Sequence, residues 1–159
     1  LAEIAMQITQ YASGHGTIVT LDVGNQYLAE IAKIRALKVL ILNIWNSLQW
    51  NYDLLPEIEC HISSDPNMDP HTDLISKTCR AVQCVLGGVD RIIIHDFPGS
   101  GGSPHLCTNI QHILKLEGWL DQVQDPLAGS YMVDKITELF TLESWKLMNK
   151  KRAGQNESK

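Results

Sequence analysis

The chain has 159 residues, of which 44% are apolar, and a formal net charge of −5. This length suits one domain with a hydrophobic core. The acidic balance, without a Lys/Arg cluster before the last residues, excludes a nucleic-acid-binding face, which needs concentrated positive charge. The longest apolar run, Ala36 to Trp45, contains Lys38 and is too short to span a bilayer. We therefore expect no nucleic-acid partner and no membrane association.

Cysteine usage indicates the compartment. The four cysteines are Cys60, Cys79, Cys84 and Cys107, and none of them forms a Cys-x-x-Cys pair. This pattern is typical of reduced thiols in a cytoplasmic protein. No signal peptide is visible, and the first residue is Leu1, so we expect a piece of a longer chain or a processed product.

Hydrophobic periodicity predicts one helix, then three strand–helix units, then one more helix. The predicted helices cover residues 1–11, 25–50, 70–86, 104–117 and 131–148, and the predicted strands cover residues 17–23, 57–63 and 89–95. The polar residues 149–159 are expected to form a disordered tail, which leaves residues 1–148 as the folded domain.

The strand patterns suggest how the predicted sheet is buried. Ile58, Cys60 and Ile62 alternate with polar residues, as in a strand with one buried face. Residues 92–94 are all isoleucine, which is typical of a strand buried on both faces. Strands alternating with helices predict parallel pairing. The expected fold class is therefore α/β, either a small three-layer fold or one arc of a TIM-type βα barrel, because three strands do not close a barrel.

Two further expectations concern the helices. Gly118 is predicted to end the helix 104–117 by adopting a left-handed conformation, and Asp125 is predicted to be a turn residue before Pro126. In the helix 70–86, the residues predicted to face inward are Leu74, Ile75, Thr78, Val82 and Val85.

Several polar residues are candidate site residues. His61 and the pair His95–Asp96 come at the carboxyl ends of predicted strands, where βα barrels build their functional face. Successive strand residues point to opposite faces, which argues against joint acid–base work by His95 and Asp96. Ser100–Ser103 is either a phosphate cradle or a surface loop. A zinc site from Cys60, His61 and His95 has a spacing unlike known patterns, so no metal site is predicted.

A series of short motifs occurs in a specific order. They are Glu-Ile-Ala-Lys-Ile-Arg-Ala at 30–36, Asp-Pro-His at 69–71, Arg-Ala-Val at 80–82, Leu-Gly-Gly-Val-Asp at 86–90, the strand end at 94–97, Asn-Ile-Gln at 109–111, Glu117-Gly118, Val-x-Asp-Pro-x-Ala-Gly-Ser-Tyr at 123–131, and Trp-Lys-Leu at 145–147. Together they resemble the last part of the barrel domain of the methylmalonyl-CoA mutase family. The resemblance covers nearly the whole chain after Thr17 and leans toward the family's non-catalytic small subunit.

This resemblance implies part of a TIM-type barrel, with this chain supplying about the last three strands. The family binds adenosylcobalamin and coenzyme A, and it interconverts methylmalonyl-CoA and succinyl-CoA by a radical rearrangement. The resemblance places His61, Ser63, Asn109 and Gln111 at substrate-binding positions and Glu117 at the position that reaches the cofactor. It implies no catalytic residue in this chain.

Departures from the family pattern point to lost activity. Ser63 replaces a glutamine that contacts substrate, Glu59 replaces an arginine that holds coenzyme A, and Thr108 replaces another arginine. Asp65-Pro66 stands where the family has the Ser-Gly-Trp step that touches the corrin. The resemblance therefore predicts a chain that is inactive alone, binds no adenosylcobalamin by itself, and pairs with a catalytic mutase subunit or another copy of itself. The alternatives are a fragment of an active acyl-CoA mutase, or an assembly module with no catalytic role.

Overall fold

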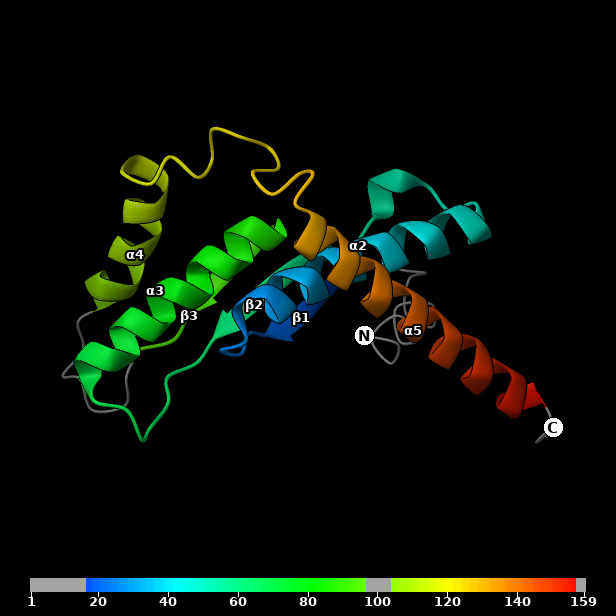
Figure 1. Cartoon of the computed structure of the whole chain (residues 1–159), viewed down its shortest axis with the longest axis horizontal. Coiled ribbons are helices and arrows are strands. Elements are labelled where there is room, and N and C mark those ends of the chain that lie inside the picture. Colours follow the sequence, from blue (N-terminus) through cyan, green and yellow to red (C-terminus); the bar gives the residue numbers. More distant parts are fainter. Residues whose placement is uncertain (1–16, 97–103, 157–159) are drawn as a thin grey trace.

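A computed structural model describes residues 17–96 and 104–156. Its elements are β1 (Ile18–Asp22), α2 (Tyr27–Leu48), the short 3-10 helix η1 (Tyr52–Leu54), β2 (Glu57–Ile62), α3 (Pro70–Gly87), β3 (Arg91–Ile94), α4 (Pro104–Leu116) and α5 (Tyr131–Asn156) (Figure 1). This order confirms the predicted alternation of strands and helices. The helix predicted over residues 1–11 and the loop Ser100–Ser103 lie outside the described residues.

The three strands form one parallel sheet in the order β1-β2-β3. Leu21 is the register partner of Cys60 in β2, and Cys60 is in turn the partner of Ile92 in β3. Parallel pairing confirms the predicted α/β class. The arrangement is consistent with an arc of a TIM-type barrel, because β1 and β2 are each followed by a helix that leads back to the start of the next strand, and β3 is followed by α4.

The two faces of the sheet differ in chemistry. One face is apolar and packs against the buried sides of α2 and α3. Its buried residues, in the strands or directly after β1, are Val19, Leu21, Val23, Ile58, Cys60 and Ile62, each at most 5% exposed. The other face, which we call the polar face, carries Glu57, Glu59 and His61 from β2 and Arg91 and His95 from the β3 side. In a βα barrel the face opposite the helices lines the barrel interior.

The prediction that the run Ile92–Ile94 is buried on both faces is wrong. Ile92 and Ile94 pack against the core, whereas Ile93 is 37% exposed on the other side. The physical reason is that β3 is an edge strand whose second face shares the polar face with Glu59 and His61. Apolar composition alone does not reveal which side of a strand lacks a covering layer.

The inward face predicted for α3 is also partly wrong. Leu74, Val82 and Val85 pack only at the margin of the core, and Ile75 is 65% exposed. The buried residues of α3 are instead Asp73, Lys77, Arg80, Ala81, Gln83, Cys84 and Gly87. Charged side chains can occupy a buried helix face when they neutralise one another and pack their alkyl stems.

The ends of α3 and α4 differ in which residue is left-handed. Gly88 caps α3 with φ of 78°, as expected for a left-handed glycine. After α4, however, the left-handed residue is Trp119, with φ of 52°, and not Gly118. Gly118 is required for a different reason, because a Cβ there would lie 2.9 Å from the carbonyl oxygen of Leu114. The left-handed conformation costs about 1–2 kcal/mol for a residue such as Trp119.

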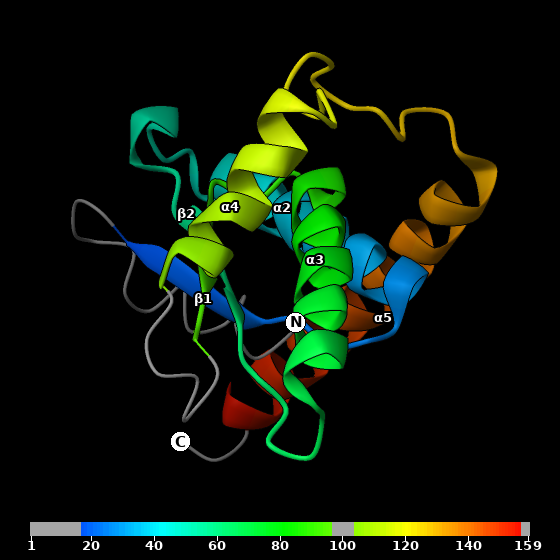
Figure 2. The same cartoon turned by 90° about the vertical axis from the view of Figure 1, so that its left-hand side faces the viewer.

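The last helix is longer than expected, because α5 continues to Asn156, past the expected start of a disordered tail at Asn149. The linker that precedes it crosses from α4 to the far side of α3, and α5 then packs along α2 (Figures 1 and 2). No helix in the described ranges is long and apolar enough to cross a membrane.

A bidentate ion pair fastens α2 to this linker. Arg35 in α2 donates from Nη1 and Nη2 to the two carboxylate oxygens of Asp125, at 2.8 and 2.9 Å. Asp125 also accepts from the backbone N–H of Leu127 at 3.2 Å, which confirms its role in the turn. The hydrogen bond from Arg35 lowers the pKa of Asp125 below its usual value. Two motifs far apart in the sequence are therefore joined directly.

We expect the substitution Arg35→Ala to lower the free energy of unfolding by about 1 kcal/mol at pH 7, since the pair is bidentate but partly exposed. The folded pKa of Asp125 is depressed, so its contribution is present above about pH 4 and is lost as the pH falls through that lowered pKa. Urea unfolding at neutral pH and at about pH 3 measures this difference, which should shrink on acidification.

The matched control is Lys146→Ala, which removes an exposed pair with Glu143 at 2.8 Å. It should change stability by less than about 0.5 kcal/mol at either pH. An Arg35→Ala protein as stable as wild type at pH 7 would show that the ion pair between Arg35 and Asp125 does not contribute to stability.

Candidate functional site

The site residues expected from the sequence do not gather at one place. His61 lies near the carboxyl end of β2, and Ser63 is the first residue after that strand. Asn109 and Gln111 lie on α4, and Glu117 follows that helix. Because α4 runs back from the carboxyl edge of the sheet, Glu117 comes near the opposite edge. Among the residues that the structure describes, no hydrogen bond or ion pair joins the two groups, and their binding roles stay predictions.

His61 is held by two polar neighbours. Its Nε2 lies 2.9 Å from Oε1 of Glu59, and its Nδ1 lies 2.9 Å from Nε2 of His95. A carboxylate can only accept a hydrogen bond, so Nε2 of His61 carries a proton and donates to Glu59, and in the neutral ring Nδ1 is then an acceptor. His95 Nε2 then donates to His61 Nδ1. Both nitrogens of the His61 ring are therefore engaged within the chain.

These contacts extend along the whole polar face. Arg91 pairs with Glu57 and lies 3.8 Å from Glu59 Oε2. A continuous series of contacts therefore runs from Glu57 through Arg91, Glu59 and His61 to His95. The side chains of Glu59 and His61 are 13% and 24% exposed, respectively, so this part of the network is sheltered. The network contains two carboxylates and one guanidinium, and that one cation, Arg91, is already paired with carboxylates.

The α4 residues have a different environment. Gln111 donates from Nε2 to the carbonyl oxygen of Ile92, at the long distance of 3.5 Å. It lines a groove of about 360 Å³ between α4 and the start of β3. Asn109 and Glu117 are exposed. The groove walls are mainly apolar, with Val85, Ile92, Leu114 and Leu120 among them.

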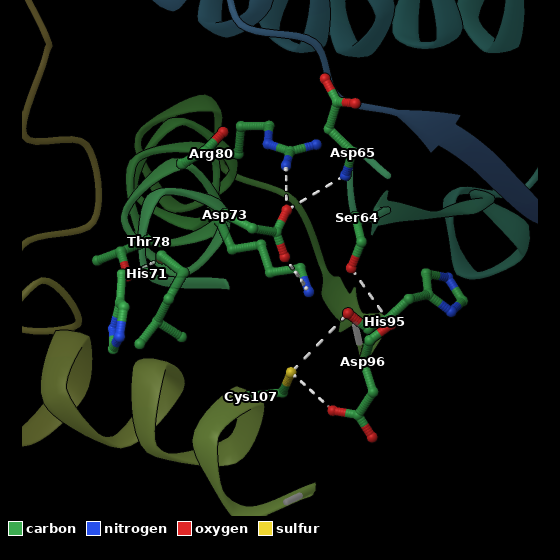
Figure 3. Close-up of polar contacts among 12 residues, drawn as sticks. Ser64, Asp65, His71, Asp73, Thr78, Arg80, His95, Asp96 and Cys107 are labelled. Carbon is green, nitrogen blue, oxygen red and sulfur yellow. Dashed lines mark hydrogen bonds and ion pairs between the residues drawn. The ribbon is translucent and has the colours of Figure 1, made fainter. Parts of the chain in front are cut away.

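A buried charged cluster lies where β2 leads into α3. Asp73 is 1% exposed and accepts from Lys77 Nζ at 2.8 Å and from the backbone N–H of Asp65 at 3.2 Å, with Arg80 4.0 Å away (Figure 3). Burial acts to raise the pKa of Asp73, but the hydrogen bonds from Lys77 and Asp65 and the charge of Lys77 outweigh it, so the pKa is lowered. The sequence signal for this cluster was the i, i+4 spacing of Asp73 and Lys77.

Next to this cluster, Cys107 of α4 meets the end of β3. Its Sγ lies 3.1 Å from Oδ1 of Asp96 and 3.9 Å from the carbonyl oxygen of His95 (Figure 3). Burial, together with the hydrogen bond and negative charge of Asp96, raises the pKa of Cys107 to about 11. As the strand alternation predicts, Asp96 contacts α4 while His95 joins the polar face.

The zinc arrangement of Cys60, His61 and His95 does not form. Cys60 is fully buried among apolar residues on the helix side of the sheet, whereas both histidines lie on the polar face. No group of three or more metal-ligating side chains gathers in residues 17–96 and 104–156. All four cysteines are free thiols.

The first prediction for this region concerns the buried cluster. Asp73→Asn should lower the free energy of unfolding by about 3 kcal/mol at pH 7, because Lys77 and Arg80 would remain buried without their carboxylate. Thermal or urea unfolding measures the effect. Asp121→Asn, at an exposed pair with Lys115, is the control and should leave stability within about 0.5 kcal/mol. A loss no larger than this control would contradict the account of α3.

The second prediction concerns thiol reactivity. With a pKa of about 11, only about one thousandth of Cys107 is thiolate at pH 8, so its alkylation should be slow. Exposed Cys79 should react first, and Asp96→Asn should accelerate Cys107 because it removes the negative charge beside the thiol. Mass spectrometry of iodoacetamide-treated protein gives both rates. Equal rates for Cys79 and Cys107 in the wild type would refute this view of the thiol.

Comparison with known proteins places the chain in a family. The model of the methylmalonyl-CoA mutase family matches residues 17–154. The methylmalonyl-CoA mutase small subunit of Porphyromonas gingivalis is 30% identical over 79% of this chain and 22% of its own length. The methylmalonyl-CoA mutase of Rhizobium meliloti is 28% identical over 82% of the chain and 20% of its own length. The mitochondrial enzyme of Bos taurus is 28% identical over 80% and 18%, respectively.

The matched segment covers most of this chain but only a small part of each relative. This chain spans about a fifth of the length of the curated relatives that it matches. Within that span the sequence motifs and the parallel βα order agree with one another. The chain therefore belongs to the methylmalonyl-CoA mutase family.

Proposed function

We propose that this chain is a non-catalytic, small-subunit-like partner in a mutase assembly, contributing βα structure to a barrel rather than reacting groups. In this proposal its partner is a catalytic mutase subunit or another copy of the chain. The observation that carries the proposal is the internal network at His61. Both ring nitrogens of His61 are engaged, by Glu59 and by His95, and neither remains for an acyl-CoA.

The charge of the polar face supports the same proposal. Coenzyme A carries phosphates, which bind at arginine, lysine or backbone N–H groups. Glu59 puts a carboxylate beside His61, and Arg91 is already paired with Glu57. A phosphate approaching this face would meet carboxylates before it met an unpaired cation. The similarity to a protein named as a small subunit agrees with this view.

The placement of Glu117 bears on the cofactor. The family generally depends on adenosylcobalamin, and Glu117 is the position that the resemblance assigns to it. Glu117 is exposed beyond the end of α4 and has no contact with His61 or Ser63 among the described residues. The resemblance assigns this chain no other cofactor position, and one exposed carboxylate does not make a site that fits the cofactor, so we infer that the chain does not bind it by itself.

The alternative is a fragment of an active adenosylcobalamin-dependent acyl-CoA mutase. It is favoured by the Asn-x-Gln motif at 109–111 and by Glu117, which keep the family's residue types, and by relatives that are named as the mutase itself. Ser63 and Glu59 weigh against it, because each replaces a family side chain that binds substrate. A third possibility, an assembly module without a mutase partner, has no specific contact in its favour.

The proposal is tested by mixing the purified chain with adenosylcobalamin and methylmalonyl-CoA. We expect no change in the visible spectrum of the corrin and no succinyl-CoA, because the network at His61 leaves no side chain for substrate. A complete methylmalonyl-CoA mutase is the positive control. A corrin spectral shift that saturates at one equivalent, or turnover by the chain alone, would support the active-fragment alternative instead.

A further inference from the structure

Two histidine rings meet at the carboxyl end of the sheet. Nδ1 of His61 in β2 lies 2.9 Å from Nε2 of His95, which follows β3. The two rings are stacked, with their centroids 5.1 Å apart and their planes at 29°. When both rings are neutral, one proton joins the two nitrogens. The pair therefore consists of two imidazole donors that are separated by a single exchangeable proton.

The separation of the two nitrogens matches that of neighbouring ligands on one metal ion. Imidazole nitrogens bind divalent transition metals at about 2.0–2.1 Å. Two nitrogens at that distance from an ion, and 2.9 Å from each other, subtend an angle of about 90° at the ion. Square-planar or tetragonal Cu²⁺ and Ni²⁺ place their ligands at right angles, whereas a tetrahedral Zn²⁺ site would need about 3.4 Å between the nitrogens. A rotation of each ring about its broad χ2 torsion turns both lone pairs toward a shared ion.

Glu59 supplies a contact that is typical of histidine ligands. A histidine that binds a metal almost always donates its other ring N–H to a carboxylate or a carbonyl, which fixes the ring and makes the binding nitrogen more basic. Oε1 of Glu59 lies 2.9 Å from Nε2 of His61, and the Glu59 side chain is only 13% exposed. This contact leaves Nδ1 as the metal-binding nitrogen of His61 and directs it toward His95. Glu59 is therefore a positioning residue for the pair.

The charge around the two rings favours a cation. Glu57 and Glu59 share the polar face with one guanidinium, that of Arg91, so this network has a surplus of negative charge. Asp22 is the register partner of His61 in β1, and strand alternation puts it on the same face. A divalent ion beside His61 would therefore meet an excess of carboxylates rather than of cations.

The pair is also accessible to an ion. The side chain of His61 is 24% exposed, and His95 is exposed. Figure 3 shows the ring of His95 turned away from Cys107, so that thiol does not compete for the same position. Within the described ranges no third metal-ligating side chain gathers with the two histidines, so water would complete the coordination of the ion.

We propose that Nδ1 of His61 and Nε2 of His95 form a two-histidine site for a divalent transition metal that prefers right-angle ligands, Ni²⁺ or Cu²⁺. On binding, His95 moves its proton from Nε2 to Nδ1 through solvent, so both rings stay neutral and no net proton is released. Glu59 keeps its hydrogen bond to His61. A single ion can enter between two touching rings, whereas an acyl-CoA would have to displace them, and this site does not rest on the proposed function.

The test is a calorimetric titration of the purified full chain with Ni²⁺, which favours imidazole over thiolate more than Zn²⁺ does. We expect one ion per chain, and His61→Ala and His95→Ala should each weaken its binding by about tenfold or more. The double variant should bind within about twofold of the weaker single variant, because the two rings hold the same ion. Ni²⁺ should raise the melting temperature of the wild type but not that of His95→Ala.

Two further variants show whether the loss is specific. His71→Ala removes an exposed histidine at the start of α3 and should bind Ni²⁺ like the wild type. Glu59→Gln keeps the shape of the side chain but not its charge, and it should weaken binding by about tenfold. Circular dichroism of the metal-free variants checks their fold, and if His61→Ala does not fold, His95→Ala gives the result.

Three outcomes would overturn the metal site. They are the lack of saturable Ni²⁺ binding by the wild type, wild-type-like binding by folded His95→Ala, and an equal loss in His71→Ala. Wild-type-like binding by Glu59→Gln would overturn the positioning role of that carboxylate. None of these results bears on the proposed function, because that proposal is tested separately with adenosylcobalamin and methylmalonyl-CoA.

Discussion

Burial of one face of β2 against α2 and α3 is the constraint on which the rest of the structure depends. Ile58, Cys60 and Ile62 are almost completely buried, and their alternation fixes the opposite orientation for Glu59 and His61. A shift of one residue in the register would exchange the two sets and bury carboxylates in the core. The polar face and its network therefore follow from the same packing that holds the sheet to its helices.

Local patterns in the sequence were enough to predict the main architecture. The alternation of β2 and the hydrophobic periodicity of the helices are read over a few neighbouring residues, and the structure confirms β2, α2, α3 and α4. The predicted helix limits lie within a few residues of the observed ones, apart from the end of α5. The motif order also pointed to the family that the family model confirms. These features depend on local chemistry, so a single sequence carries them.

Features that depend on a distant partner could not be predicted in the same way. The buried side of α3 holds Asp73, Lys77 and Arg80, and a hydrophobic pattern assigns such residues to the surface unless their mutual pairing is known. Asp125 had the character of a turn residue, but its bond to Arg35 joins positions 90 residues apart. The left-handed residue after α4 is Trp119, whereas Gly118 is needed where the backbone passes close to the carbonyl oxygen of Leu114. Predicting each of these features requires knowing which residues are neighbours in three dimensions, and sequence spacing does not contain that information.

The substitution at Glu59 connects the fold to the functional proposal. An arginine at this position would be a cation on the polar face, whereas Glu59 bonds to His61 and lies near Arg91, so its charge is held within the network. In the proposed function, this substitution leaves a surface whose charged groups are paired with one another rather than with a phosphate. Structural roles can persist after such a change, because the buried side of β2 is unaffected by it.

The most direct test of this account is the protonation of His61, measured from the nitrogen-15 chemical shifts of its ring. The account predicts a proton on Nε2, facing Glu59, an acceptor at Nδ1, and no change in either shift when methylmalonyl-CoA is added. A proton on Nδ1 in the free chain, or a shift of either nitrogen on adding the acyl-CoA, would contradict it.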